Sequence, residues 1–166
     1  FKKKIKNFSV LQLDAHRDLR HSYQGSKHSH ACIAKRIIEL TSLTQVGIRS
    51  LSKDEAGKGY KNLKTFFMKD MTSNDNWISE AIDSLPSDNV YVTIDMDAFD
   101  PSIMPSVGTP EPGGMGWYGT LALLKRLALK KKVIGFDVVE LSPIPGNVSP
   151  DFLTAKLVYK FLSYIF

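Results

Sequence analysis

Short apolar runs alternate with longer amphipathic stretches along this sequence. Residues 9–13 are mostly apolar and end at Asp14, a run typical of a strand covered on both faces, as in a parallel sheet. Residues 90–95 are rich in β-branched and aromatic side chains and give the clearest strand signal. The pattern predicts further strands at 133–139 and, more weakly, at 45–49 and 65–68.

Apolar residues at helical spacing lie between the predicted strands. Asn74 or Asp75 is a candidate cap for one helix, and Ser149 for the last helix, with Pro150 at its first position. The predicted helices span residues 31–40, 53–57, 77–85, 117–129 and 150–164. Residues 22–29 are polar, residues 100–116 are rich in Pro and Gly, and we expect both segments to be loops.

The alternation of strands and helices predicts an α/β fold with a mainly parallel sheet. A length of 166 residues fits one domain spanning 1–166, and the sequence contains no internal repeat. In such sheets, ligands bind beyond the carboxyl ends of the strands. We therefore expect the chemistry of this protein at the strand ends.

Composition excludes several classes of protein. Apolar residues make up 43% and charged residues 23%, which argues against disorder, and no apolar run is long enough to span a membrane. The net charge of +5 comes largely from lysine runs at 2–4 and 130–132, which lack interleaved aromatic residues, so no nucleic-acid partner is expected. The single Cys32 excludes an internal disulfide and fits a reducing compartment, so we expect a cytoplasmic protein.

Acidic residues follow three of the predicted strands. Because side chains alternate along an extended chain, residues two apart point the same way. Asp100, before Pro101, is expected to form a turn, and Asp137 is either a partner of the site residues or a buried structural acid. The strand-end groups are Asp14, His16 and Asp18; Asp95 and Asp97; and Asp137 and Glu140.

Four carboxylates and an imidazole in one crevice require a compensating charge. Oxygen-rich sites with an imidazole suit Mn²⁺ or Mg²⁺, and the number of ligands fits two metal ions that share bridging carboxylates. A lone Asp-x-Asp is more often a turn or cap, whereas Asp-x-His-x-Asp is rarer by chance. The combination therefore predicts a metal site.

Other candidate groups lie in the loops. His30 could move protons, because the pKa of histidine lies near working pH, although His28 and His30 could equally be polar loop residues or caps. Cys32 is expected to pack in the interior. Residues 108–114 lack the spacing of a phosphate-binding loop and are expected to form a pocket wall.

Five segments together resemble the ureohydrolase family of arginases and agmatinases, and the agmatinase branch in particular. They are LDAHRDLR, SHAC, TIDMDAFDPS, GTPEPGG and DVVELSP, in family order from about Val10 to the C-terminus. The resemblance implies a three-layer α/β/α arginase-like fold. It also implies hydrolysis of a guanidino group to an amine and urea, with agmatine giving putrescine in polyamine biosynthesis.

The resemblance assigns a role to each site residue. Two Mn²⁺ ions would be bridged by Asp14 and Asp95, with Asp18 completing one metal site and His16 and Asp97 the other. His30 would match the catalytic histidine, and Glu140 the glutamate that holds the substrate guanidinium. Members of the family are oligomers, so the resemblance also implies a homo-oligomer.

The sequence departs from the family pattern at its beginning. The family carries another metal-binding histidine in an upstream Gly-Gly-acid-His-Ser motif, which this sequence lacks, and the first residue is Phe1 rather than Met. We therefore interpret the chain as an N-terminally truncated, C-terminal portion of the fold and expect weaker metal occupancy at the Asp18 site. Alternatives are a different guanidino substrate, such as guanidinobutyrate or arginine, or a non-catalytic metal-binding or assembly module.

Overall fold

A five-stranded sheet forms the centre of the computed structural model, which describes residues 5, 7–57 and 59–166. The strand order is β3-β2-β1-β4-β5, and every neighbouring pair is parallel. This confirms the predicted α/β fold with a parallel sheet. The strands are β1 (Ser9–Leu13), β2 (Ser42–Ile48), β3 (Leu63–Phe67), β4 (Asn89–Asp95) and β5 (Lys132–Val139).

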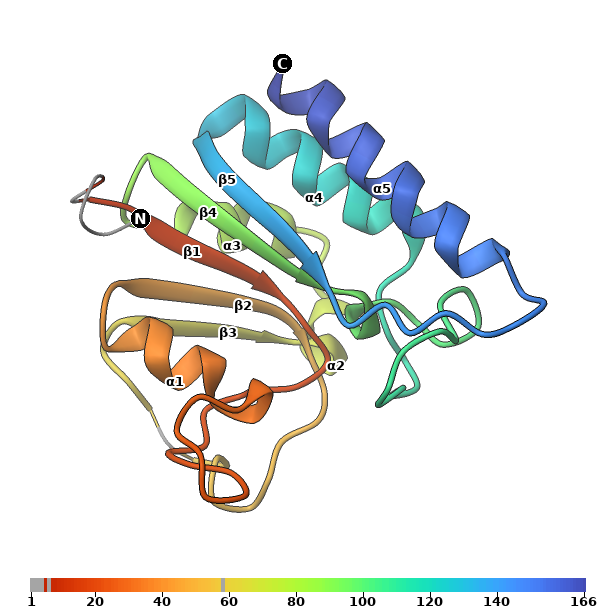
Figure 1. Cartoon of the computed structure of the whole chain (residues 1–166). Helices are drawn as coiled ribbons and strands as arrows, with labels where there is room; N and C mark the ends of the chain where they lie inside the picture. The colour runs from red at the N-terminus through yellow and green to blue at the C-terminus, as the bar shows by residue number, and fades with distance from the viewer. Residues whose placement is uncertain (1–4, 6, 58) are drawn as a thin grey trace.

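Helices lie on both faces of the sheet, and Figure 1 shows α1 on one face and α3 on the other. Within the described part of the chain, no helix is long and apolar enough to cross a membrane. The helices are η1 (His30–Cys32), α1 (Ile33–Ile38), α2 (Met68–Met71), α3 (Trp77–Asp83), η2 (Met96–Ala98), α4 (Trp117–Lys130) and α5 (Ser149–Ile165).

Strand β1 supplies both hydrophobic cores, which is why its sequence shows little polar alternation. Leu11 and Leu13 point to the larger core, which they share with residues of α3, α4 and α5. Val10 points to the opposite face and packs in a smaller core with Ala34 and Ile38 of α1. Burial on both faces gives the three α/β/α layers that the resemblance implied.

The predicted short helix at 53–57 is wrong. This segment forms turns, in which the Glu55 carboxylate accepts hydrogen bonds from the backbone amides of Ser52 and Leu19. Gly57 then takes a left-handed backbone with φ of 73°, which ends any helical path. Long-range hydrogen bonds to Glu55 therefore override the local helical pattern.

Several predicted boundaries also shift. Strand β2 begins at Ser42, three residues earlier than predicted, because Ser42 pairs with Ser9 at the start of β1. The predicted 31–40 helix begins as a 3₁₀ turn at His30 and its α-helical part ends at Ile38. Met68, predicted to end a strand, instead begins α2.

The predicted helix caps differ from those observed. Asn76, rather than Asn74 or Asp75, precedes α3, and Asn74 instead accepts a hydrogen bond from the Asn76 amide. Val148 precedes α5, so that Ser149 is already its first residue. Neither helix has a side-chain cap.

Of the two lysine runs, the structure describes the one at 130–132. Lys130 and Lys131, at the end of α4, form ion pairs with Asp83 and Asp88. The run at 2–4 lies outside the described residues.

Asp100 organises the long loop between β4 and α4. Its carboxylate accepts hydrogen bonds from the backbone amides of Ser102, Gly113 and Gly114, each 2.9 Å long. Hydrogen bonding to the Ser102 side chain and to these amides lowers the pKa of Asp100 to about 2. The turn predicted at Asp100 is therefore confirmed. The loop folds back so closely that a Cβ atom added at Gly114 would lie 2.5 Å from the carbonyl carbon of Phe99.

We predict that Gly114→Ala lowers the free energy of unfolding by about 1–3 kcal/mol, because the added methyl group collides with backbone atoms that cannot move aside easily. Urea unfolding measures this effect. The matched control is Gly116→Ala, where the added Cβ meets nothing within 4 Å and φ is −88°. Equal stabilities of the two variants would contradict the prediction.

Candidate metal centre and pocket

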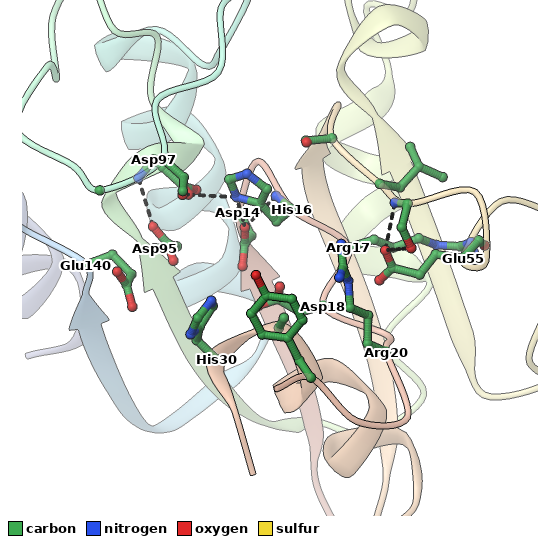
Figure 2. A pocket seen from close by; sticks show the side chains of 17 residues that line it. Asp14, His16, Arg17, Asp18, Arg20, His30, Glu55, Asp95, Asp97 and Glu140 are labelled. Atoms are coloured by element: carbon green, nitrogen blue, oxygen red, sulfur yellow. Dashed lines mark hydrogen bonds and ion pairs between the residues drawn. The ribbon is translucent and has the colours of Figure 1, made fainter. Parts of the chain in front are cut away.

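One pocket of about 410 Å³ lies at the carboxyl ends of the strands, and all seven predicted site residues line it. Figure 2 shows Asp95 and Asp97 beside Asp14 and His16, with Glu140 and His30 also facing this space. The pocket thus lies where the sheet rule predicts ligand binding. The predicted residues that line the pocket are Asp14, His16, Asp18, His30, Asp95, Asp97 and Glu140.

The tightest group in the pocket is Asp14, His16 and Asp97, whose candidate ligand atoms all lie within 4.8 Å of one another. His16 Nδ1 lies 2.8 Å from Asp97 Oδ2 and 3.7 Å from Asp14 Oδ1. Both acids are buried. These three side chains are close enough to bind one metal ion.

Neighbouring strands explain this convergence. Leu13 of β1 pairs with Ile94 of β4, so the next residues, Asp14 and Asp95, leave the sheet side by side. Backbone amides then fix the acids: the Asp97 amide donates to Asp95 Oδ1, and the Ala15 amide donates to Asp97 Oδ1. Asp18 follows on the loop after β1, with an unusual left-handed φ of 52°.

Three of the acids resist ionisation. Burial raises the pKa of Asp14, and burial together with the nearby Asp14 raises the pKa of Asp18 to about 8 and that of Asp95 to about 10. A cation among these groups would replace the missing favourable charge. The donor set of carboxylates and one imidazole fits a divalent ion such as Mn²⁺.

The imidazole of His16 lies close enough to Asp14 and Asp97 to offset part of their negative charge. Hydrogen bonding to Asp14 and Asp97 raises the pKa of His16 to about 10. Burial opposes ionisation of Asp97, but hydrogen bonds from His16 and from the Ala15 amide outweigh it and lower the pKa of Asp97. A protonated imidazole between two acids occupies the position that a cation would otherwise take.

Glu140 and His30 line the same pocket but are exposed to solvent. Glu140 follows β5 with φ of 64°, and His30 packs edge-on against the ring of Tyr23. Left-handed backbone is uncommon for residues other than glycine. Among the described residues, two of the three such positions, Asp18 and Glu140, line this pocket, and strain of this kind is typical of functional sites.

Sequence reasoning missed several supporting residues. Gln12 Nε2 donates to Asp14 Oδ2, and Gln45 Nε2 donates in turn to Gln12 Oε1. The signal was available, because Gln12 interrupts the apolar residues 10–13 and shares the parity of Asp14.

No sequence pattern marked Arg49, although this residue joins the end of β2 to the long loop between β4 and α4. Its guanidinium donates hydrogen bonds to the backbone carbonyls of Asp97, Ala98, Phe99 and Glu111, at 2.7–3.3 Å. Burial lowers the pKa of Arg49 against the opposing influence of Asp97. The residue thereby holds the Asp97 turn against the wall of the pocket.

Three other features predicted from the sequence lie outside the group of proposed metal ligands. Asp137 accepts hydrogen bonds of 2.7 Å from both Tyr91 and Thr93, neither of which lines the pocket, so it has the surroundings of a structural acid. Cys32 is fully buried, as predicted for a packing residue. The predicted pocket wall at 108–114 contributes Gly108 and Thr109.

Comparison with known proteins gives a consistent result. Residues 1–163 match the arginase family. The chain is 48% identical over 159 residues to N(1)-aminopropylagmatine ureohydrolase from Synechocystis sp., covering 95% of this chain and 52% of that protein. It is 39% identical over 153 residues to agmatinase from Pyrococcus horikoshii, covering 91% of this chain and 53% of that protein.

The fold is also similar to a solved structure. The agmatine ureohydrolase of Thermoplasma volcanium superposes with a TM-score of 0.87 and 36% sequence identity. The superposition covers 97% of this chain and 56% of that chain. The chain therefore spans about half the length of the relatives it matches.

We predict that Asp95→Asn raises the free energy of unfolding by about 0.5–2 kcal/mol in the presence of a chelator. The amide removes an acid whose ionisation is unfavourable and keeps an oxygen to accept the Asp97 amide. Urea unfolding at pH 7 is the measurement. Asp100→Asn is the control and should lower the free energy of unfolding, because ionisation of Asp100 is favoured in the folded protein. An Asp95→Asn protein less stable than the wild type would contradict the prediction.

Proposed function

Because this chain belongs to the arginase family, we propose that it carries the metal and guanidino sites of a ureohydrolase acting on agmatine-type substrates. The observation that supports this most strongly is the convergence of carboxylates and one imidazole from separate strand ends in a single pocket. The family resemblance alone would not supply this geometry. The chemistry below follows from the side chains that line the pocket.

The proposed metal ligands are the five residues at the ends of β1 and β4. His16 and Asp97 would hold one Mn²⁺ ion, Asp18 would belong to the other site, and Asp14 and Asp95 would bridge the two. When bound, the ions would lower the pKa of a water molecule, so that the nucleophile is available near neutral pH. The raised pKa values of Asp14, Asp18 and Asp95 support this assignment, since each acid lacks sufficient positive charge in the protein alone.

Glu140 is the proposed anchor for the guanidinium group. Its carboxylate lines the same pocket on the side of Asp95 (Figure 2) and can accept two parallel, charge-assisted hydrogen bonds from a planar guanidinium. Such a pair would turn the face of the group toward the nucleophile. The fixed backbone after β5 would limit how far this carboxylate can move.

His30 is the proposed proton carrier. The water oxygen attacks the guanidinium carbon, the bond from that carbon to the alkyl nitrogen breaks, and the nitrogen must gain a proton to leave as an amine. The exposed imidazole of His30, at the rim of the pocket, can exchange protons with solvent and deliver one there. The products are urea and the protonated amine, and the step neither oxidises nor reduces the substrate.

Agmatine and its N1-aminopropyl derivative are the proposed substrates. Relatives named for each of them match more than 90% of the chain, and the sequence follows the agmatinase pattern. Arginine and guanidinobutyrate are the alternative substrates, and a metal-binding module without activity is the alternative function. A cytoplasmic location and a homo-oligomer stay predictions.

We predict one tight and one weak Mn²⁺ site in this 166-residue chain. His16→Ala should weaken the tight site by more than about 100-fold, because even outer partners of metal ligands change affinity by about 10–100-fold. Asp18→Ala should leave that site unchanged. Calorimetric titration measures both affinities, with the exposed His28, which does not line the pocket, changed to Ala as the control. Two equally tight sites would contradict the prediction.

We predict urea release from agmatine or N1-aminopropylagmatine by the Mn²⁺-loaded protein, expressed from the complete reading frame that encodes these residues. His30→Asn should lower kcat by about 10²–10⁴-fold, and Glu140→Gln should lower kcat/KM by about 10–150-fold through loss of a charged hydrogen bond. His28→Asn is the matched control for His30. If a folded, metal-loaded protein released no urea from any of the four guanidino compounds, the module without activity would be favoured.

A further inference from the structure

We infer that Glu111 is a positioning residue whose carboxylate orients the imidazole of His16 toward the metal ions. The inference rests on the proposed function, because it gives Glu111 a role only if His16 binds a metal ion. The sequence pattern offered only a wall-forming role for the 108–114 loop. The structure brings a charged group of that loop to the far side of the imidazole.

The two ring nitrogens of His16 face different carboxylates. Nδ1 lies 2.8 Å from Asp97 Oδ2, inside the acid cluster. Nε2 lies 3.8 Å from Glu111 Oε1, within ion-pair distance on the other side of the ring. The ring therefore has one nitrogen for the proposed metal ion and the other for Glu111.

Glu111 is itself held in place from the end of β2. The Ser50 hydroxyl donates a 2.8 Å hydrogen bond to the same Glu111 oxygen that faces His16. Arg49 donates to the backbone carbonyl of Glu111 at 2.7 Å. Ser50 also forms a parallel bridge with His16, so one short segment fixes both the ring and the carboxylate.

This arrangement has a clear chemical effect. A histidine that binds a metal through one nitrogen almost always donates its other N–H group to a carboxylate, carbonyl or water, which fixes the tautomer and makes the ligand more basic. At 3.8 Å the negative charge of Glu111 would act through space, favouring the proton of a neutral His16 on Nε2 and leaving the Nδ1 lone pair for the metal.

Calorimetric Mn²⁺ titration of the wild-type chain, Glu111→Ala and Glu111→Gln tests the inference. We expect Glu111→Ala to weaken the His16 site by about 10–100-fold. Glu111→Gln, which keeps an oxygen to accept the Nε2 proton but loses the charge, should recover part of the affinity. The control is Glu39→Gln, at an exposed carboxylate that pairs with Arg36 away from the pocket.

The Mn²⁺ affinity of His16→Ala and the stability of the Glu111 variants distinguish a failure of this inference from a failure of the proposed metal site. Unchanged Mn²⁺ affinity in Glu111→Ala, together with a large loss in His16→Ala, would overturn the positioning role and leave the proposed function intact. Unchanged affinity in both variants would overturn the metal site and the inference with it. Urea unfolding without metal identifies a merely structural role: both Glu111 variants would then lose stability equally, with no recovery of affinity in Glu111→Gln.

Discussion

Repulsion among acids at the ends of β1 and β4 is the constraint around which this structure is arranged. A parallel sheet places Asp14 and Asp95 side by side, and Asp97 turns back to join them. Backbone amides and the His16 imidazole offset part of the negative charge. The remaining negative charge is unfavourable for the protein alone and would be offset by a cation, which supports the proposed metal site.

Segments far apart in the sequence hold this cluster in place. The Ala15 amide reaches Asp97 across 82 residues, and Arg49 reaches the carbonyl of Glu111 across 62. Asp100 closes the long loop by accepting the amides of Gly113 and Gly114. The pocket is therefore supported by backbone contacts on several sides, which hold the proposed metal ligands in position.

Sequence reasoning located the cluster because two simple rules act at the same place. Period-two alternation relates Asp14 to His16, and parallel strands end at a common edge. The Arg49 contacts were beyond reach, because carbonyl acceptors carry no sequence signature. Glu111 was missed since the path of its loop depends on distant contacts. The helix predicted at 53–57 is wrong because the Glu55 carboxylate also accepts a hydrogen bond from the distant Leu19 amide.

The left-handed backbone at Asp18 and Glu140 restricts how these positions can evolve. Glycine and asparagine adopt this conformation most readily, whereas valine, isoleucine and threonine are disfavoured there. Glycine or asparagine at either position would therefore remove the carboxylate while leaving the path of the backbone unchanged.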